Sequence, residues 1–350
     1  MIRLAIVGTG NMANTHANEF NKIEGVKIVA ACDISKKNVE EFAGKHKIKK
    51  TFLCVSDLLN YGDFDAVANV TPDRFHFETS VPFIDAGKHV LCEKPLAENY
   101  PDSLKMAELA ESKRIVNMVN FSYRNASAIN KTHKLINENK IGKIIHVEAS
   151  YLQSWLVSKA WGEWEKESKW LWRLSSKHGS KGVLGDVGVH ILDFATYPVG
   201  EVKRLNCFLK TFENIKGSKI GEYQLDANDS AIINLEFKNG ALGTIQTTRW
   251  AVGHHNTLEL GVFGSKGAIK VNLDESQSEL KICTGKNIDA AKWEKMDCGN
   301  QKSIYELFIQ AILNDKQENP NFRRGSEIQK LLEICEKSHC EGKILNVLKN

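Results

Sequence analysis

The sequence predicts a two-domain α/β protein of 350 residues. Its first third alternates short β-branched runs with amphipathic stretches, which is typical of a parallel sheet covered by helices on both faces. After about residue 123 this alternation stops, and longer strand patterns indicate an α+β domain. We therefore expect domains over residues 1–123 and 124–350, with the option that the last helices pack back on the first domain.

The composition excludes several classes of partner. Hydrophobic residues make up 42% and charged residues 26% of the chain, as in an ordinary globular protein. The 47 basic and 43 acidic residues are spread along the chain, so we expect neither nucleic acid nor a membrane as a partner. No apolar run has the length of a membrane span and no signal-peptide pattern is present, which favours the cytoplasm.

The cysteines fit a reduced protein. They form no C-x-x-C pair, and five of the eight lie in or beside apolar runs. We expect these five to be buried packing residues: Cys32, Cys54, Cys92, Cys207 and Cys283.

The elements of the first domain follow in order. The strand-like runs are "IRLAIV", "VKIVAACD", "DAVANV", "KHVLCE" and "RIVNMV", at residues 2–7, 26–33, 65–70, 88–93 and 114–119. The helical patterns between them cover residues 12–22, 36–45, 75–86 and 100–113. This order predicts consecutive strand–helix units of one parallel sheet.

The first turn, "GTGNMA", matches a dinucleotide fingerprint. Gly8 permits a tight turn, Gly10 lets a pyrophosphate approach the backbone, and the small Ala13 lets helix and strand pack closely. The turn follows a strand and opens a helix whose N-terminus attracts the anion. We therefore expect cofactor contacts from this turn: Gly8, Thr9, Gly10, Asn11 and Met12.

The second strand ends at Asp33, twenty residues after Ala13. A carboxylate at this position binds the adenosine ribose hydroxyls and repels a ribose phosphate, which favours NAD over NADP. Ser35, Lys36 and Lys37 follow closely and could accept that phosphate, so NADP remains possible.

Polar motifs lie where three later strands end. In such a sheet, ligands bind outside the carboxyl ends of the strands. The motifs are "TPDRFH", "EKPL" and "NFSYRN". We expect the first two to complete the dinucleotide site through Thr71, Pro72, His76, Glu93 and Lys94.

Lys94 is the strongest single candidate. A lysine is usually a solvated surface charge, but Lys94 lies at a strand end between Glu93 and Pro95. Pro95 restricts the backbone and is a candidate for a cis peptide bond. Desolvation beside a positively charged nicotinamide ring would let this lysine exchange protons near neutral pH.

The second domain begins with a helical pattern at 125–139 and the strand pattern "KIIHVEASYLQ" at 143–153. A tryptophan-rich segment and a helical stretch around residue 190 come next. Further strand patterns lie at 202–212, 229–237, 241–250, 257–263, 268–273 and 279–284, followed by helical patterns at 302–314 and 326–340.

The stretch "GVLGDVGVHILD" places Asp186, His190 and Asp193 on one face of a helix. A zinc site would need further ligands at suitable spacing, and no motif supplies them, so we expect no metal. Asp186 could be a helix N-cap and His190 a core histidine. The third interpretation is a proton-transfer pair. Taken alone, the stretch favours the N-cap and core interpretation.

Together, "GTGNMA", "TPDRFH", "CEKPL", "YRNASA", "IGKIIHVEA" and "GVLGDVGVHILD" resemble, in this order, the Gfo/Idh/MocA family of nicotinamide-dependent sugar and polyol oxidoreductases. The resemblance covers nearly the whole chain. It implies an N-terminal Rossmann domain and a C-terminal α+β domain with a large, open, mostly antiparallel sheet. "YRNASA" departs from the family's more usual Arg-Phe-x-Pro run, which leaves the lining around Asn125 open.

The resemblance also implies catalytic roles for Lys94, Asp186 and His190 toward the nicotinamide and the substrate. His190 would take the hydroxyl proton, Asp186 would hold substrate and support the imidazolium, and Lys94 would stabilise oxyanion charge. Asp193 would bind substrate or orient the helix. The expected substrate contacts are Lys94, Tyr123, Arg124, Trp172, Arg173, Asp186 and His190.

Five of the seven tryptophans lie just before the Asp186 helix: Trp155, Trp161, Trp164, Trp170 and Trp172. An indole face suits a sugar ring. For most of the five we instead expect a buried cluster or an oligomer contact.

The function expected is reversible hydride transfer between NAD or NADP and a secondary hydroxyl of a sugar, sugar derivative or cyclitol, in a homodimer or homotetramer. Two alternatives stay open. One is a glycosidase of the same superfamily that retains NAD, and the other is a non-catalytic regulator that binds sugar and nucleotide. The intact "EKP" and "DVGVH" motifs count against the regulator.

Overall fold

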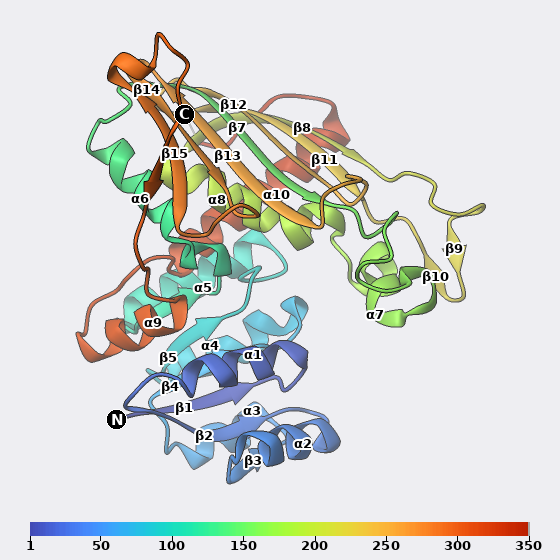
Figure 1. Ribbon diagram of the computed structural model, residues 1–350. Coiled ribbons are helices and arrows are strands. Elements are labelled where there is room, and N and C mark those ends of the chain that lie inside the picture. Colours follow the sequence, from blue (N-terminus) through green and yellow to red (C-terminus); the bar gives the residue numbers. More distant parts are fainter. Residues whose placement is uncertain (349–350) are drawn as a thin grey trace. The chain divides into compact units, whose positions relative to one another are not determined.

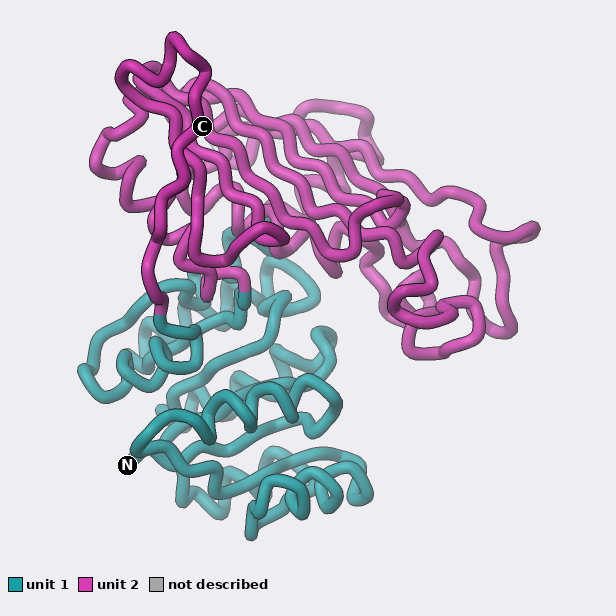
Figure 2. The backbone as a smooth tube through the Cα atoms, viewed as in Figure 1, with its two compact units in different colours: residues 1–122, 302–330 teal, residues 123–301, 331–350 magenta. Residues whose placement is uncertain are grey.

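The computed structural model describes residues 1–348 and divides into two compact units (Figure 2). Unit 1 comprises residues 1–122 and 302–330, and unit 2 comprises residues 123–301 and the chain from 331 onward. The chain thus leaves unit 1, builds most of unit 2, and returns to unit 1. Helix α10 (Phe322–Glu341) then runs out of unit 1 and ends in unit 2.

Unit 1 is built on a six-stranded sheet in which every strand pair is parallel (Figure 1). Its order is β3-β2-β1-β4-β5-β6, the strand order of a Rossmann fold. The bounds are β1 (Ile2–Val7), β2 (Val26–Cys32), β3 (Lys50–Phe52), β4 (Ala66–Asn69), β5 (His89–Cys92) and β6 (Asn117–Val119). The predicted fold class is therefore confirmed for this part of the chain.

Helices follow the strands of unit 1, and all except α3 correspond to helical patterns predicted from the sequence. They are α1 (Asn11–Phe20), α2 (Lys36–His46), α3 (Val55–Tyr61), α4 (His76–Asp85), α5 (Tyr100–Lys113), α9 (Ile304–Leu313) and the first half of α10. Tyr305 and Phe308 of α9 pack in the same buried cluster as Leu4 and Ile6 of β1. The late segment 302–330 therefore completes the core of the first unit.

Unit 2 contains a nine-stranded sheet in the order β16-β15-β14-β13-β7-β12-β11-β8-β17. The pair β12 with β7 is parallel and the other described pairs are antiparallel, so the prediction of a mostly antiparallel sheet is confirmed. The bounds are β7 (Ile144–Gln153), β8 (Val202–Lys210), β11 (Ser230–Phe237), β12 (Leu242–Thr248), β13 (Asn256–Gly264), β14 (Gly267–Asn272), β15 (Glu279–Thr284), β16 (Glu294–Asp297) and β17 (Leu345–Asn346).

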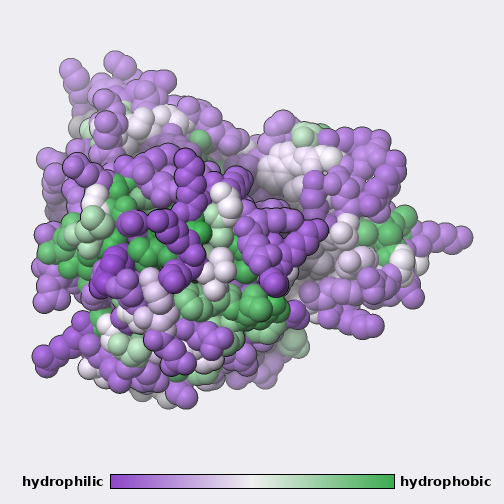
Figure 3. All heavy atoms as spheres, turned by 90° about the horizontal axis from the view of Figure 1, so that it is seen from below, coloured by the Kyte–Doolittle hydropathy of each residue, from purple (hydrophilic) through white to green (hydrophobic). Residues whose placement is uncertain are grey.

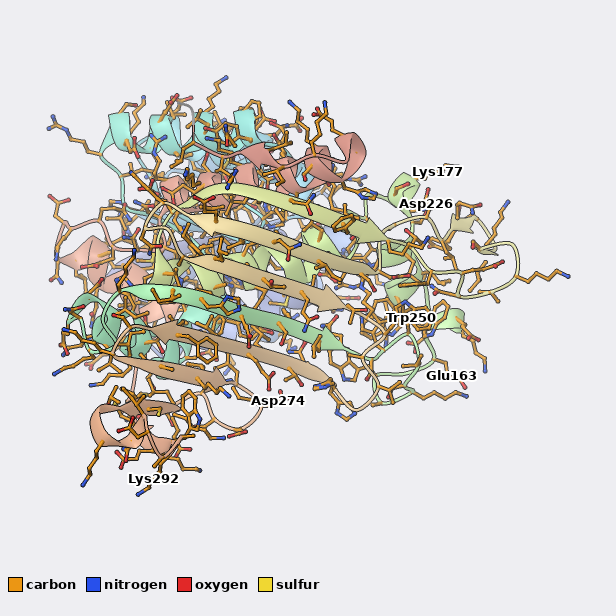
Figure 4. The ribbon with its side chains drawn as sticks, turned by 90° about the horizontal axis from the view of Figure 1, so that it is seen from above. Glu163, Lys177, Asp226, Trp250, Asp274 and Lys292 are labelled. Atoms are coloured by element: carbon orange, nitrogen blue, oxygen red, sulfur yellow. The ribbon has the colours of Figure 1, made fainter. Side chains whose placement is uncertain are left out.

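The two faces of this sheet differ. Helices α6 (Ser127–Asn137) and α8 (Val189–Val199) contact β7, β12, β13, β14 and β15 from one face (Figure 1). The strands lie uncovered when the opposite face is viewed in Figure 4. Cross-strand pairing places one row of residues on that open face: Phe208, Ile232, Gln246, Ser150, Glu259 and Asn272.

The tryptophan-rich segment lies at one end of the nine-stranded sheet, together with α7 (Ser168–Leu171) and the hairpin of β9 (Lys219–Ile220) and β10 (Tyr223–Gln224) (Figures 1 and 4). Trp155 and Trp164 are buried there, and Trp161 and Trp170 pack against them in part. A buried cluster is thus the environment of four of the five clustered tryptophans.

The surface of the described residues is of mixed polarity. Figure 3 shows a largely hydrophilic face that is interrupted by separate hydrophobic patches. No helix within residues 1–348 is long and apolar enough to cross a bilayer. One packing prediction is wrong: Cys54 is exposed, because it precedes the short surface helix α3, which the sequence pattern did not predict.

Candidate active site

The turn between β1 and α1 has the backbone that the Gly-x-Gly pattern predicts. Gly8 has φ +84°, and a Cβ at this position would lie 2.7 Å from the backbone of Val70 and Thr71. Only glycine fits here without displacing the neighbouring strand end. A Cβ on Gly10 would meet no atom within 4 Å, so space is open beside this residue.

Helix α1 begins at Asn11 with no side-chain cap on its first turn. The N–H groups of Asn11 and Met12 are therefore available for an anion, which a pyrophosphate supplies, whereas the Ala13 N–H donates to the Gly10 carbonyl at 3.2 Å. Gly10, Asn11 and Met12 are exposed at this point, whereas Thr9 is buried. The open space and the uncapped helix start together fit a dinucleotide.

Asp33 at the end of β2 fixes the tip of the same turn. Its Oδ2 accepts hydrogen bonds from the Thr9 backbone N–H at 2.8 Å and the Thr9 hydroxyl at 2.9 Å. Its Oδ1 accepts from the Ser35 N–H at 2.8 Å. A carboxylate oxygen can accept two or more bonds, so these contacts orient Asp33 and leave acceptor capacity for ribose hydroxyls.

Lys94 follows β5 directly and lies half-buried in the turn formed by Glu93, Lys94 and Pro95. The Lys94–Pro95 peptide bond is cis, which confirms the sequence prediction. The Lys94 N–H donates to Glu93 Oε2 at 3.1 Å. Lys94 therefore emerges from a tightly organised stretch at the carboxyl edge of the parallel sheet.

Glu93 is buried and held by two donors. Its Oε1 accepts from His16 Nε2 at 2.7 Å and from Asn120 Nδ2 at 2.6 Å. Burial by itself raises the pKa of Glu93, but His16, Asn120 and the charge of Lys94 outweigh burial and lower the pKa to about 2. Glu93 therefore remains a carboxylate and acts on the turn rather than as an acid.

This lowered pKa predicts a pH dependence of stability. The pKa of Glu93 lies below its ordinary value of 4.5 in the folded chain, so its contribution is complete above pH 4.5 and is lost as the pH falls toward 2. Between neutral pH and about pH 3, the wild-type protein should lose about 2 kcal/mol more unfolding free energy than Glu93→Gln. Urea titrations measure this difference, with the exposed Glu78→Gln as the control. Parallel losses in all three proteins would contradict it.

His76 has a different position from the cofactor contact expected of it. Its ring is 1% exposed, and its Nδ1 and Nε2 each lie 2.7 Å from a backbone carbonyl, of Pro95 and Thr71 respectively. Burial lowers the pKa of His76, and the two carbonyls oppose that shift. Because both nitrogens serve the backbone, we assign His76 to the organisation of the turn. Thr71 is half-buried and Pro72 is exposed, so both remain candidates for contact with the cofactor.

In unit 2, Asp186 lies in a π-helical turn, Leu184–Gly188, that leads directly into α8. Asp186 is therefore not the N-cap that one interpretation of the sequence expects. Its Oδ1 accepts from Arg173 Nη1 at 2.9 Å, and its Oδ2 accepts from Arg249 Nη2 at 3.1 Å. Two guanidinium groups thus fix the orientation of this carboxylate.

His190 lies one turn further along α8 and is 9% exposed. The Tyr123 ring meets it edge to face, with ring centroids 5.0 Å apart. The Tyr123 hydroxyl belongs to a network with Tyr151 at 2.6 Å and Asn256 at 3.0 Å. Burial raises the pKa of both tyrosines, so their hydroxyls stay protonated near neutral pH. This network fixes the ring beside the imidazole.

Arg124 and Asp193 form a buried pair. Arg124 donates to both Asp193 oxygens, at 2.6 and 2.8 Å, and its guanidinium lies over the Tyr197 ring. Arg124, for which a contact with substrate is predicted, thus makes a bidentate bond to Asp193 within unit 2. Of the two roles considered for Asp193, the bond to Arg124 favours orientation of α8.

Removal of one partner should be costly because the other charge remains buried. Arg124→Met should lower the unfolding free energy by about 3–5 kcal/mol. Arg323→Met removes an exposed bidentate pair with Glu111 and should cost under about 1 kcal/mol. Equal losses in urea unfolding of the two variants would contradict the buried-pair interpretation.

Trp172 and Arg173 remain accessible. Trp172 is 39% exposed, and the Arg173 guanidinium lies 4.8 Å from its ring centroid. Trp172 is thus the member of the tryptophan group whose ring is most available for a sugar. Arg173 joins this ring to Asp186, since it also donates to that carboxylate.

The sequence interpretation missed residues whose partners are distant in the chain. Arg249 is fully buried, although it ends an alternating strand pattern in which an apolar residue is expected. That mismatch was the available signal. His16, on the buried face of α1, and Asn256, at the start of β13, gave no signal that distinguished them from ordinary polar residues.

Within residues 1–348, no group of three or more His, Cys, Asp and Glu side chains is arranged to hold a metal ion. The chemistry available to His190 and Asp186 is that of an imidazole and a carboxylate fixed by two arginines.

Comparisons with known proteins agree with this geometry. A model of the oxidoreductase family with NAD-binding Rossmann fold matches residues 2–121. A model of the GFO/IDH/MocA C-terminal domain matches residues 129–270. Together the two matches span most of both units.

Characterised relatives act on several substrates. The levoglucosan dehydrogenase of Pseudarthrobacter phenanthrenivorans is 32% identical over 63% of this chain, and the match spans only 58% of that relative's length. The glucose-6-phosphate 3-dehydrogenase of Bacillus subtilis is 26% identical over 95% of both chains. The myo-inositol 2-dehydrogenase of Thermotoga maritima is 27% identical over 77% of this chain and 74% of its own.

Solved structures share the fold along the whole chain. An oxidoreductase domain protein from Kribbella flavida aligns with a TM-score of 0.88, at 26% identity and full coverage of both chains. Levoglucosan dehydrogenase in complex with NADH and levoglucosan aligns with a TM-score of 0.87 over 99% of this chain and 100% of its own, at 23% identity, which shows the fold alone. From the two family matches, this chain belongs to the Gfo/Idh/MocA family of oxidoreductases, with an NAD-binding Rossmann domain at residues 2–121.

Proposed function

We propose that this protein is a nicotinamide-dependent dehydrogenase that acts reversibly on a secondary hydroxyl of a sugar, sugar derivative or cyclitol. The observation that carries the proposal is the position of Lys94 at the carboxyl end of β5, in the same parallel sheet as the Gly8–Gly10 turn and Asp33. Ligands bind at this edge of a doubly wound sheet. In this proposal residues 1–123 bind the nucleotide and residues 124–350 supply the substrate contacts.

The nucleotide-binding residues follow from the turn geometry. NAD, when bound, accepts a hydride from the carbon that carries the hydroxyl. The first turn of α1 binds the pyrophosphate, and Asp33 accepts hydrogen bonds from the ribose. Asp33 favours NAD. NADP is the alternative because Lys36 and Lys37 are exposed beside it.

Three residues act on the substrate hydroxyl. The His190 imidazole accepts its proton, since histidine exchanges protons near neutral pH. Asp186 is the fixed negative charge that supports the resulting imidazolium, held in place by Arg173 and Arg249. Lys94 donates a hydrogen bond to the oxygen and stabilises the negative charge that develops there.

The substrate class is inferred from the exposed ring of Trp172, the neighbouring Arg173 and Tyr123, and the relatives. An aromatic face binds the C–H face of a sugar or cyclitol ring, and the polar groups fix its hydroxyls. The named relatives act on levoglucosan, glucose 6-phosphate and myo-inositol. Their variety supports a ring-bearing polyol rather than one particular sugar.

The test is nicotinamide absorbance with purified protein, NAD or NADP, and a panel of inositols, aldoses, anhydrosugars and glycosides. Reduction of the nucleotide by a polyol or sugar is the expected result, and it identifies the substrate class. Consumption of a glycoside without net reduction would replace this proposal with the NAD-retaining glycosidase. Binding without any conversion would replace it with the regulator.

The open sheet face supports a homodimer or homotetramer. Phe208, Ile232 and Leu242 lie on this face and are each about half exposed or more, while the helices cover the other face. We propose that a second copy of the chain covers it, since exposed apolar side chains gathered on one face mark association sites. Light scattering of Phe208→Asp should show loss of the oligomer, and an unchanged mass would exclude this face.

A further inference from the structure

Two buried histidines contact the turn that carries Lys94, and neither takes part in the proposed reaction. One is His16 on α1, and the other is His76 at the start of α4. They contact the residues on either side of Lys94, namely Glu93 and Pro95. All four belong to unit 1.

His16 holds the side chain that precedes Lys94. Its ring is fully buried, packs edge to face on Tyr305, and donates from Nε2 to Glu93 Oε1 at 2.7 Å. The other Glu93 oxygen accepts the N–H of Lys94 itself. The bond from His16 therefore fixes a carboxylate that in turn fixes the Lys94 backbone.

The other ring nitrogen of His16 shows that placing a histidine here costs free energy of folding. Nδ1 is buried and has no hydrogen-bond partner among the described residues. An apolar side chain in this place would avoid an unsatisfied buried polar atom. The presence of a histidine here indicates that the bond from Nε2 to Glu93 is what this position requires.

His76 holds the residue that follows Lys94. Its Nδ1 contacts the Pro95 carbonyl, and its Nε2 contacts the Thr71 carbonyl. Both acceptors are carbonyl oxygens, so a neutral ring donates to one of them at a time. In either tautomer the His76 ring lies between the turn after β5 and the turn after β4 and contacts both.

We propose that His16 and His76 are positioning residues that fix the Lys94 side chain for its role in the reaction. The inference rests on the proposed function of Lys94. A catalytic group must be held within a fraction of an ångström by neighbours that are themselves locked, and here two helices supply those neighbours.

The test measures Lys94 directly and needs no substrate. A trace of acetic anhydride acetylates the lysines of the intact, nucleotide-free protein over a range of pH. Mass spectrometry then gives the extent of acetylation of Lys94 relative to that of the exposed Lys37. The Lys94→Arg variant has no lysine to acetylate at this position, so the acetylated peptide that it lacks is the one that contains Lys94. In His16→Leu and in His76→Leu, the acetylation of Lys94 relative to Lys37 should differ from that of the wild type by about threefold or more at one or more pH values in the range.

Conservative variants separate positioning from general stability. His16→Gln keeps a donor near Nε2 and His76→Asn keeps one near Nδ1, so both should restore the wild-type labelling curve. His89→Gln is the matched control, because His89 bonds the Val116 N–H at the other end of the same strand. Thermal melts show whether each variant folds. If a leucine variant does not fold, the phenylalanine variant at the same position, His16→Phe or His76→Phe, is used instead.

Folded leucine or phenylalanine variants with the wild-type Lys94 curve would overturn the proposal, as would an equal change in His89→Gln. If the substrate panel identifies a substrate, the leucine variants should also lose about 100-fold in kcat with little change in KM for NAD. A panel without turnover would count against the proposed function alone, because the labelling result stands without it.

Discussion

Lys94→Ala protein should bind NAD about as tightly as the wild type and lose turnover by a factor of about 1,000 or more. The side chain lies half-buried at the carboxyl end of β5, whereas the proposed pyrophosphate and ribose contacts come from the first turn of α1 and from Asp33. Truncation therefore removes the proposed donor to the reacting oxygen and leaves the nucleotide contacts in place. Nucleotide titration followed by steady-state kinetics measures both quantities.

Lys105→Ala is the control for this variant. Lys105 lies on the exposed side of α5 over the Phe77 ring and has no part in the site. It should keep wild-type kcat. Unchanged turnover in Lys94→Ala would remove Lys94 from the mechanism, and a combined loss of NAD binding would show that the lysine acts on the nucleotide instead.

Gly8→Ala should lower NAD affinity about 100-fold or more, because binding at a glycine turn depends on close approach to the backbone. The new Cβ would lie 2.7 Å from backbone atoms of Val70 and Thr71, and φ is +84°, which an alanine adopts only at a cost of about 1–2 kcal/mol. Val70 and Thr71 directly follow β4, so making room for the new Cβ would displace either the end of this strand or the Gly8 turn. Calorimetric titration of NAD gives the affinity, and urea unfolding gives the stability.

Alanine variants of two further glycines are the controls for Gly8→Ala. Gly44→Ala on α2 meets no atom within 4 Å, so it should leave NAD affinity unchanged and raise the unfolding free energy by about 0.5–1 kcal/mol. Gly10→Ala also meets none, so it should fold normally and lose affinity only because its methyl group occupies the space proposed for the pyrophosphate. If Gly8→Ala binds NAD as the wild type does, this turn is not the nucleotide site.

Much of the fold could be predicted because its signals are local. The strand–helix alternation up to residue 119 corresponds to β1, β2 and β4–β6 and to the helices after them. Strand β3 was missed because its three residues are mostly exposed and carry no apolar run. The return of residues 302–330 to the core of unit 1 was left only as an option, since packing between distant segments leaves no periodic pattern.

The candidate site shows the same division. Gly8, Asp33 and Lys94 were singled out from motifs at strand ends, which are local in sequence. Asp186 and His190 were noted from their spacing, but only the family resemblance implied their catalytic roles. Arg249 was missed since its partner Asp186 is 63 residues away. Arg124 was expected to contact substrate, but a bidentate bond to Asp193, 69 residues away, engages it. Sequence spacing gives the type of group, whereas its partners depend on the tertiary fold.

The central claim is that a hydride passes from a C–H bond of a ring polyol to the nicotinamide. The most direct test is incubation with NAD and ring-deuterated sugars and cyclitols, followed by mass spectrometry of the nucleotide. The account predicts that each reduced nucleotide gains one deuterium atom from an oxidised compound, and that the gain disappears in Lys94→Ala. Consumption of a deuterated compound with no deuterium in the nucleotide pool would contradict it.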